Sequence, residues 1–341
     1  MLSRDTKIKD VTAKHPGRSV RKPQDNEYGY VLGVDGGGTK TLALAADFRG
    51  NVLGRGTSGA SNYQTVGLDR AIAALKEASE AAMAAAGIDR FEVACFGLAG
   101  VGRESDRDLL LPAIEKLELA DRIILVHDAA IALAGATAGQ PGVVVLAGTG
   151  AMAFGMNSKG GTRRAGGWGN ILADEGSAYY IGRRALAAAC RAYDGRGPET
   201  VLVSKLMEHF GLDNFTDIVR KIYKEEASPQ KIASLAPLVS QLAEAGDRIA
   251  AEILKDAAEE LALAARAVIK CLNMEDEEFQ VAASGSVFKA GELLLTPFAE
   301  SVKSIAPRAE VIPPRFEPAM GAVLLALQAV GVDLSGVIAT D

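Results

Sequence analysis

The sequence has few cysteines and no long apolar run. Cys95, Cys190 and Cys271 lie far apart and form no CxxC pair. Disulfide frameworks, zinc sites and iron–sulfur clusters need closer or more regular spacing, so we expect three buried thiols in a reducing cytoplasm. No apolar stretch reaches the length that crosses a bilayer, so we expect no membrane partner and a cytoplasmic location.

An excess of basic residues is also absent. The chain has 37 Lys and Arg against 43 Asp and Glu, a net charge of −6, which argues against nucleic-acid binding as its main role. Residues 1–28 differ, with seven basic and four acidic side chains. They lack the apolar core of a signal peptide, so we predict a disordered or loosely docked tail. A processed targeting segment is the alternative.

Glycine is abundant where two apolar runs end. Residues 30–34 run into Asp35-Gly-Gly-Gly-Thr39, and residues 143–146 run into Ala147-Gly-Thr-Gly150. Each pattern predicts a strand, a tight glycine turn and a second strand. Glycine lets backbone N–H groups approach anionic oxygens without a Cβ in the way. Two such hairpins facing each other predict a clamp for a nucleoside triphosphate.

The order of elements occurs twice along the chain. Strands at 30–35, 41–47 and 52–57 precede a helix over 69–86, strand 91–97, a helix near 104–118, strand 122–126 and a helix near 129–138. From residue 142 the order restarts, with strands at 142–147, 151–157 and 161–165, a helix from about 176, strand 278–283, a helix, strand 309–312 and helix 319–330. The fold class is therefore α/β with a duplicated βββαβαβα order.

This duplication predicts two lobes with a cleft between them. The N-terminal lobe spans 29–139, and the C-terminal lobe spans 140–318 with a helical insertion over about 198–272. The last helix, about 319–333, is expected to pack back on the first lobe. Two unrelated α/β domains are the alternative. The dinucleotide GxGxxG pattern and the P-loop both fail here, because their spacing does not fit and both need a helix where a strand follows.

Two carboxylates stand at positions suited to chemistry. Asp35, at the mouth of the first hairpin, can hold Mg²⁺ through water, although an Asp before glycines can also be a turn residue. Asp128 follows a buried strand and either caps the next helix or acts as the general base toward a hydroxyl. Lys40 is either a phosphate contact or solvated. Strand alternation places His127 on the opposite face, so we interpret it as structural.

A second dense signal is the segment 164–177, whose four glycines surround the only tryptophan. Such a segment is neither a regular helix nor a central strand, and we predict a substrate-binding loop that includes Gly167, Trp168 and Gly169. Asp174 either bonds substrate hydroxyls or caps the helix that follows. An anchoring role for Trp168 is as well supported as ligand stacking.

Two further turns complete the predicted site. Asn62, after the third strand, offers a donor and an acceptor for a sugar, with a plain turn as the alternative. Gly285 lies between a strand and a helix start, where an adenosine can rest against bare backbone. The predicted nucleotide-binding set is Gly37, Gly38, Thr39, Lys40, Gly148, Thr149, Gly150, Gly285, Ser286 and Lys289.

In combination these motifs resemble the BadF/BadG/BcrA/BcrD-type ATPase family, in its N-acetylglucosamine kinase-like branch, from about Tyr30 to Gln328. The match also includes Ser61-Asn62, Asp128-Ala-Ala130 and Pro318-Ala-Met-Gly-Ala322. The resemblance implies RNase H-like, actin-like ATPase lobes, ATP contacts at Thr39, Thr149, Gly285 and Lys289, and a homodimer. For the sugar it implies contacts at Asn62, Asp128, Gly167 to Gly169 and Asp174, with Asp128 as base.

The chain departs from the resemblance at one point. Ala151-Met152 stands where the similar sugar kinases carry a polar Ser-Asn pair, and a methionine cannot donate to a hydroxyl. The expected activity is Mg-ATP-dependent phosphorylation of an amino sugar, N-acetylglucosamine or glucosamine, with the sugar identity left open. An ATPase or sugar sensor without phosphorylation is the alternative. Iron–sulfur activators of the same superfamily need cluster cysteines that this chain lacks.

Overall fold

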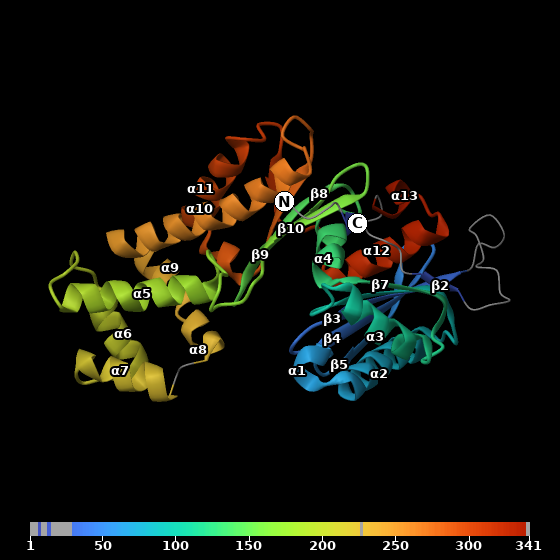
Figure 1. The fold of residues 1–341 in the computed structure, drawn as a ribbon, viewed down its shortest axis with the longest axis horizontal. Coiled ribbons are helices and arrows are strands. Elements are labelled where there is room, and N and C mark those ends of the chain that lie inside the picture. The colour runs from blue at the N-terminus through green and yellow to red at the C-terminus, as the bar shows by residue number, and fades with distance from the viewer. Residues whose placement is uncertain (1–5, 8–11, 15–28, 226–227, 339–341) are drawn as a thin grey trace. The chain divides into compact units, whose positions relative to one another are not determined.

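The computed structural model describes residues 6–7, 12–14, 29–225 and 228–338, drawn as a ribbon in Figure 1. Contacts divide these residues into two compact units. Unit 1 contains the described residues up to Gly142, together with Ser158–Thr162 and the segment from Pro313 onward. Unit 2 contains Val143–Asn157 and Arg163–Ile312.

A six-stranded sheet with the order β2-β7-β6-β3-β4-β5 forms the centre of unit 1. Strands β3, β4 and β5 form an antiparallel meander, whereas β6 runs parallel to both β3 and β7. In β3, β4 and β6 the side chains on both faces are largely buried, which explains the near-continuous apolar runs in these parts of the sequence. The strands are β2 (Thr12–Lys14), β3 (Tyr30–Gly36), β4 (Thr41–Asp47), β5 (Val52–Ser58), β6 (Phe91–Leu98) and β7 (Ala120–His127).

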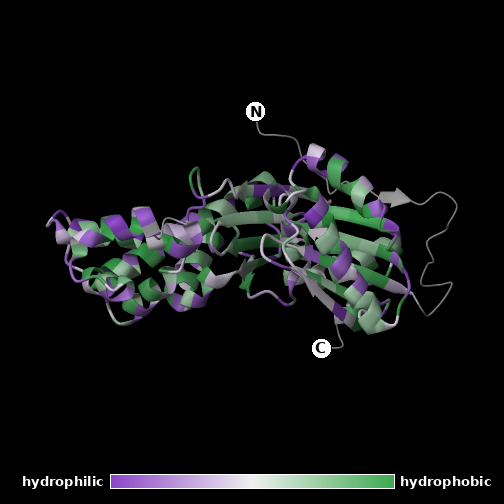
Figure 2. Ribbon diagram, turned by 90° about the horizontal axis from the view of Figure 1, so that it is seen from below, coloured by the Kyte–Doolittle hydropathy of each residue, from purple (hydrophilic) through white to green (hydrophobic). Residues whose placement is uncertain are grey.

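Helices cover both faces of this sheet. The helices α2 and α3 pack with one set of strand side chains, including Leu32, Phe96 and Leu125, into one core. The helices α4 and α12 pack on each other and on the opposite face. Figure 2 shows hydrophobic colour along the strands and mixed colour along the helices. The helices of unit 1 are α1 (Tyr63–Val66), α2 (Leu68–Ala86), α3 (Glu104–Glu115), α4 (Asp128–Ala136), α12 (Pro318–Val330) and α13 (Ser335–Ile338).

The packing of α12 on the rest of unit 1 depends on glycine. A Cβ on Gly321 would lie 1.9 Å from the carbonyl oxygen of Ile131 in α4, and one on Gly33 would lie 2.5 Å from the backbone nitrogen of Val323. Real Cβ atoms do not approach backbone this closely, so only glycine permits the observed spacing. Helix α12 therefore belongs to the core of unit 1, although it follows unit 2 in the sequence.

A second six-stranded sheet has the order β1-β10-β9-β8-β11-β12, in which β11 and β12 are parallel, and most of its strand residues belong to unit 2. The core lies between this sheet and the helices, and it contains buried side chains from β8, β9, β11 and the long helix α10. The strands of this sheet are β1 (Thr6–Lys7), β8 (Gly142–Ala147), β9 (Ala151–Met156), β10 (Gly161–Gly166), β11 (Gln280–Ser284) and β12 (Glu310–Ile312).

Unit 2 is rich in helices because a helical segment separates α5 from β11. Helix α10 packs on β9, and α11 lies beside α10 (Figure 1). The α-helices are α5 (Ala178–Tyr193), α6 (Leu202–Phe210), α7 (Ile218–Arg220), α8 (Pro229–Ala233), α9 (Ala236–Glu244), α10 (Arg248–Cys271) and α11 (Glu292–Lys303). Short 3₁₀ helices at Phe215–Asp217 and Ser286–Ala290 and a π-helix at Lys221–Glu225 complete the unit.

The duplicated βββαβαβα order is confirmed. The sequence-based prediction of a disordered tail over 1–28 lies mostly outside the described residues, and where the structure describes that segment, Thr6–Lys7 and Thr12–Lys14 are strands. The expectation of three buried thiols was wrong in part. Cys95 is buried in β6, whereas Cys190 and Cys271 are half-buried, and none of the three takes part in a disulfide. Across the described residues, no helix is long and apolar enough to span a membrane.

Candidate active site in two half-sites

The first half-site lies in unit 1, where β3 turns into β4. Asp35 is the last side chain before Gly36, and the turn closes with the Gly37 N–H donating to the Lys40 carbonyl at 3.0 Å. Gly38, Thr39 and Lys40 are exposed, and a Cβ on Gly38 would meet nothing within 4 Å. The turn therefore leaves open space beside its backbone, as the predicted phosphate-binding role requires.

The loop around Ser61 and Asn62 is hydrogen-bonded to this turn and to the strand after it. The Ser61 N–H donates to the Gly37 carbonyl at 3.0 Å, and the buried Thr41 hydroxyl donates to the Ser61 hydroxyl at 2.8 Å. Asn62 caps α1, because its Oδ1 accepts the Gln64 N–H at 3.1 Å. No described residue accepts a hydrogen bond from the Asn62 Nδ2 group. Asn62 thus fixes local structure with one end of its amide and keeps a donor at the other.

Asp128 stands at the start of α4, directly after β7. Its Oδ1 accepts the Ala129 N–H at 2.8 Å. His127 is the N-cap residue, and its Nδ1 lies 2.6 Å from the same Asp128 Oδ1. The prediction that strand alternation places His127 on the face opposite Asp128 was wrong, whereas its interpretation as a structural residue stays a prediction. Strand alternation ends where the chain turns into the helix, so neighbouring side chains converge instead of diverging.

Negative charge gathers around Asp35. Burial, followed by the charge of Asp128, raises the pKa of Asp35 to about 6; Lys40 acts in the opposite direction, and Glu317 adds a further upward contribution. Arg55 pairs with Glu317 and offsets part of its charge. A half-buried carboxylate among like charges is poorly stabilised when ionised. It therefore favours a bound cation.

The second half-site lies in unit 2, between β8 and β9. The Gly148 N–H donates to the Gly150 carbonyl at 2.9 Å, and the Gly148 carbonyl accepts the Ala178 N–H from α5 at 2.8 Å. Thr149 projects from the exposed tip. Gly285 crosses the end of β8, where a Cβ would lie 2.3 Å from the Ala147 carbonyl oxygen. The two glycine turns of unit 2 are therefore in direct backbone contact.

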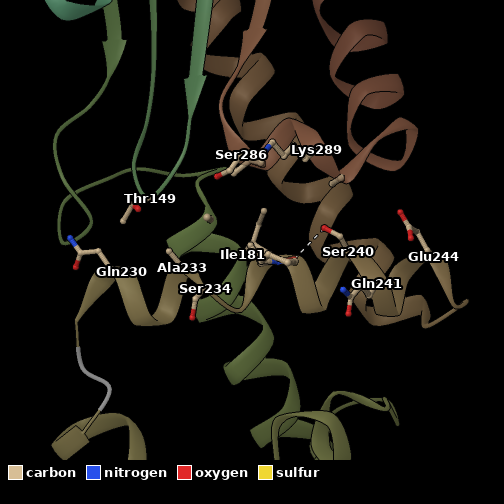
Figure 3. A pocket seen from close by; sticks show the side chains of 15 residues that line it. Thr149, Ile181, Gln230, Ala233, Ser234, Ser240, Gln241, Glu244, Ser286 and Lys289 are labelled. Atoms are coloured by element: carbon tan, nitrogen blue, oxygen red, sulfur yellow. Dashed lines mark hydrogen bonds between the residues drawn. The ribbon is translucent and has the colours of Figure 1, made fainter. Parts of the chain in front are cut away.

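A cavity of about 570 Å³ opens beside these turns, entirely within unit 2. Its volume is typical of pockets for small ligands. Figure 3 shows Ser286 and Lys289 along one rim, Thr149 and Gln230 toward one end, and Gln241 and Glu244 toward the other. Three of the predicted nucleotide contacts, Thr149, Ser286 and Lys289, line this cavity. The remaining polar lining comes from α8 and α9.

Asp174 connects the β8–β9 hairpin to the glycine-rich loop. Its carboxylate accepts the backbone N–H groups of Ala151 and Gly169, and burial raises its pKa. Its φ of 65° lies in the left-handed region, which is uncommon for a residue other than glycine. The alternative of Asp174 as the helix cap was wrong, because the Ser177 side chain accepts the Tyr180 N–H and caps α5. Asp174 as a whole is only 8% exposed.

The glycine-rich loop carries exposed apolar side chains. Trp168, Ile171 and Leu172 are 66%, 90% and 78% exposed, so Trp168 is not a core residue within unit 2. The Arg164 guanidinium lies 5.1 Å from the centroid of the Trp168 ring. Met152 lies under the loop, because a Cβ on Gly167 would lie 3.2 Å from the Met152 Cβ. Met152, which replaces a polar residue of the similar sugar kinases, thus places an apolar side chain against the predicted sugar-binding loop.

The residues of unit 1 suit Mg²⁺. A single half-buried carboxylate among like charges fits an ion that takes one or two protein carboxylates and completes its shell with phosphate oxygens and water. Over the residues that the structure describes, no cluster of three or more His, Cys, Asp or Glu forms a complete protein cage. Asp35 would hold such an ion, and the ion would neutralise developing phosphate charge.

Sequence reasoning missed the polar residues of the cavity that come from the helical insertion. Gln230, Ser234, Ser240, Gln241 and Glu244 lie on α8 and α9 or between them. No motif marks them, because the polar face of an amphipathic helix resembles a solvated surface. Glu317 was also missed, although its place directly before Pro318 at the start of α12 is a recognisable helix-start signal.

Two α/β units, each with a glycine turn after its first strand, define an actin-like ATPase fold of the sugar-kinase type. The profile of the BadF/BadG/BcrA/BcrD ATPase family matches residues 32–326, and the chain belongs to this family. It is 33% identical over 299 residues to an N-acetylmuramic acid/N-acetylglucosamine kinase of Clostridium acetobutylicum, covering 87% of this chain and 98% of the relative.

Two more comparisons agree with this assignment. An N-acetyl-D-glucosamine kinase of Dictyostelium discoideum is 37% identical over 309 residues, covering 87% of this chain and 97% of the relative. The crystal structure of a candidate N-acetylglucosamine kinase from Chromobacterium violaceum superposes with a TM-score of 0.67 at 30% identity, covering 89% of this chain and all of the other. Sequence and fold thus lead to the same family.

Proposed function

We propose that the protein is an ATP-dependent kinase that phosphorylates a hydroxyl of an amino sugar, N-acetylglucosamine or glucosamine. The observation that carries this proposal is the pair of carboxylates in unit 1. Strand β6 runs parallel to both β3 and β7, and Leu98 of β6 pairs with Gly36 on one side and with His127 on the other, so Asp35 and Asp128 lie at the same edge of the sheet. One carboxylate for Mg²⁺ and one for an acceptor hydroxyl are what phosphoryl transfer requires.

The proposed roles divide between the two units. In unit 1, Asp35 holds Mg²⁺, the turn Gly37–Lys40 contacts phosphate oxygens, and Asp128 takes the proton of the sugar hydroxyl. In unit 2, the turn Gly148–Gly150 contacts phosphate, and the cavity beside Gly285 and Lys289 takes the nucleoside. The proposed direct sugar contacts are Asn62 and the loop Gly167–Gly169, and Asp174 takes part indirectly. Asp174 acts by holding that loop, since its own carboxylate is occupied by backbone N–H groups.

A coupled assay of ADP release tests the activity. Purified protein is given Mg-ATP and, in separate reactions, N-acetylglucosamine, glucosamine, N-acetylmuramic acid, N-acetylgalactosamine and glucose. We expect at least one N-substituted or free amino sugar to raise ADP release well above the rate without sugar, with a sugar phosphate as product. ADP release that no sugar stimulates would reject the kinase and favour an ATPase or sugar sensor.

The variant Asp128→Asn tests the mechanism. General-base assistance contributes on the order of 10²–10⁴-fold in rate, so we expect kcat to fall by roughly 10²-fold or more while the sugar still binds. A kcat within about threefold of wild type would leave Asp128 as a residue of the helix start only. Homodimer formation is proposed from the family resemblance, and light scattering tests it. The cytoplasmic location remains a prediction from the cysteine usage.

A further inference from the structure

The loop that follows β6, Ala99–Arg103, lies against Asn62, and we call it the β6–α3 loop. Strand β6 lies between β3 and β7, so this loop leaves the same edge of the sheet as the turn after Asp35. The Gln64 side chain donates to the Gly100 carbonyl at 3.0 Å. A Cβ on Gly100 would lie 2.9 Å from Asn62 Oδ1, so only glycine fits beside this amide. Ligands of α/β sheets bind outside the carboxyl ends of parallel strands, where this loop lies.

The contacts of Asn62 fix which end of its amide faces the protein. Its Oδ1 accepts the Gln64 N–H at 3.1 Å. The reversed amide would place one N–H group against another and lose this hydrogen bond. The Nδ2 group is therefore the end that is left for a ligand, and it can only donate. Its partner must be an oxygen that accepts, such as a hydroxyl or acetamido oxygen of a sugar.

Asp106 joins the β6–α3 loop to α1. One of its carboxylate oxygens accepts the Tyr63 hydroxyl at 2.5 Å, and the other accepts the N–H groups of Gly102 and Arg103 at 3.0 and 2.7 Å. Asp106 is 5% exposed. Burial opposes its ionisation, but these hydrogen bonds outweigh burial and lower the pKa of the carboxyl. An ionised carboxylate therefore links the residue that follows Asn62 to the loop beside it.

We propose that Asp106 and Tyr63 are positioning residues, which hold the β6–α3 loop against Asn62 so that the Nδ2 group of this amide donates to an oxygen of the sugar. This inference rests on the proposed kinase function. Asp106 is buried and the Tyr63 hydroxyl is bound to it, so neither group is free to contact the sugar itself. Loss of the link weakens sugar binding through the orientation of Asn62, and it leaves the nucleotide and the base Asp128 unaffected.

Removal of one hydroxyl tests the link. Tyr63→Phe keeps the ring, which packs against the core of unit 1, and removes the donor to Asp106. We expect the KM for sugar to rise about threefold to tenfold, with kcat and the KM for ATP within about twofold of wild type. Tyr30→Phe is the matched control, because Tyr30 packs against the same core at the far end of β3 from Gly36. It should leave all three constants unchanged.

Two further variants test the amide itself. Asn62→Asp keeps an oxygen that accepts the Gln64 N–H, so the start of α1 is retained, but its second oxygen cannot donate. We expect the KM for sugar to rise about tenfold or more, with the thermal midpoint close to wild type. Gly100→Ala should also raise this KM, because its methyl group would displace the Asn62 amide. Gly87→Ala is the control for Gly100→Ala, since Gly87 also has a positive φ but a Cβ there would meet nothing within 4 Å.

A double-mutant cycle separates positioning from structure. If Tyr63 acts through the amide, Tyr63→Phe causes no further rise of the sugar KM in an Asn62→Asp background. A similar rise in both backgrounds would overturn the inference. So would a sugar KM within twofold of wild type in Tyr63→Phe or in Asn62→Asp. If Tyr63→Phe does not fold, Asp106→Asn takes its place in the cycle, because the single oxygen of asparagine cannot accept on both sides of the link.

The same measurements separate this inference from the proposed function. A wild-type protein that phosphorylates no sugar would reject the kinase itself. A wild-type kinase whose sugar KM is unchanged in Tyr63→Phe and in Asn62→Asp would keep the kinase and reject only the roles of Asp106, Tyr63 and the Asn62 donor.

Discussion

Gly285 and Ala147 meet backbone to backbone, since a Cβ on Gly285 would lie 2.3 Å from the Ala147 carbonyl oxygen. The φ of Gly285 is also 113°, outside the range of ordinary side chains. This contact joins the turn that follows β11 to the end of β8, and the turns after both strands border the cavity. The shape of the proposed nucleotide site therefore depends on one missing side chain.

We expect Gly285→Ala to raise the KM for ATP by about tenfold or more and to lower stability by about 1–3 kcal/mol, because backbone must shift to admit the methyl group. Steady-state kinetics and denaturant unfolding measure the two effects. Gly291→Ala is the matched control. Gly291 also has a positive φ, 69°, but a Cβ there would meet nothing within 4 Å. Equal effects at both positions would show that strain, not the contact, is responsible.

Gly38 offers the opposite situation in unit 1. Its surroundings are empty to 4 Å and its φ is not positive, so Gly38→Ala should leave the thermal midpoint unchanged. The added methyl group would nevertheless stand where phosphate is proposed to bind, so we expect the KM for ATP to rise severalfold. Gly36→Ala should instead destabilise the fold, since its Cβ would lie 2.5 Å from Ser61 Oγ. An unchanged KM in Gly38→Ala would remove this turn from the nucleotide site.

The raised pKa of Asp35 predicts a pH-dependent cost in the ligand-free protein. Its pKa is about 6 in the folded state against 3.8 without perturbation. Between these values the folded state binds the extra proton, so this group lowers stability as pH rises from about 4 to 6. The variant Asp35→Asn has no ionisable group at this position, so it should not lose this stability as pH rises. In EDTA, thermal unfolding should show Asp35→Asn to be more stable than wild type at pH 8 and similar to wild type at pH 4. The variant should also lose its Mg-ATP-dependent activity. Equal stability at pH 8 would contradict the raised pKa.

The only tryptophan reports on the glycine-rich loop. Trp168 is 66% exposed, and Gly166, Gly167 and Gly169 all have positive φ values. We expect a saturable change in tryptophan emission, with a shift to shorter wavelength, when the true sugar binds, because the indole leaves water. An ATP analogue alone should change it little. A flat titration with a sugar shown independently to bind would remove this loop from the sugar site.

The order of strands and helices could be predicted from the sequence because apolar runs mark the elements and turn residues mark their ends. The Asp35-Gly-Gly-Gly turn is one example, since its local sequence dictates its backbone. The contacts of His127 could not be predicted from the sequence, because the alternation of side chains along a strand ends at the last residue before a helix. Asp174 is similar. Its left-handed φ turns the carboxylate back toward Ala151 and Gly169, and nothing in the sequence indicates that conformation for an aspartate.

The distant origin of α12 has a consequence for synthesis of the chain. The strands of unit 1 are complete by residue 127, but the helix that covers the Gly33 side of β3 begins at Pro318. During translation the ribosome must add nearly two hundred further residues, including all of unit 2, before that face can be covered. The part of the protein that is made first is therefore the last to finish folding, and an interrupted chain would leave its nascent sheet open to chaperones or to aggregation.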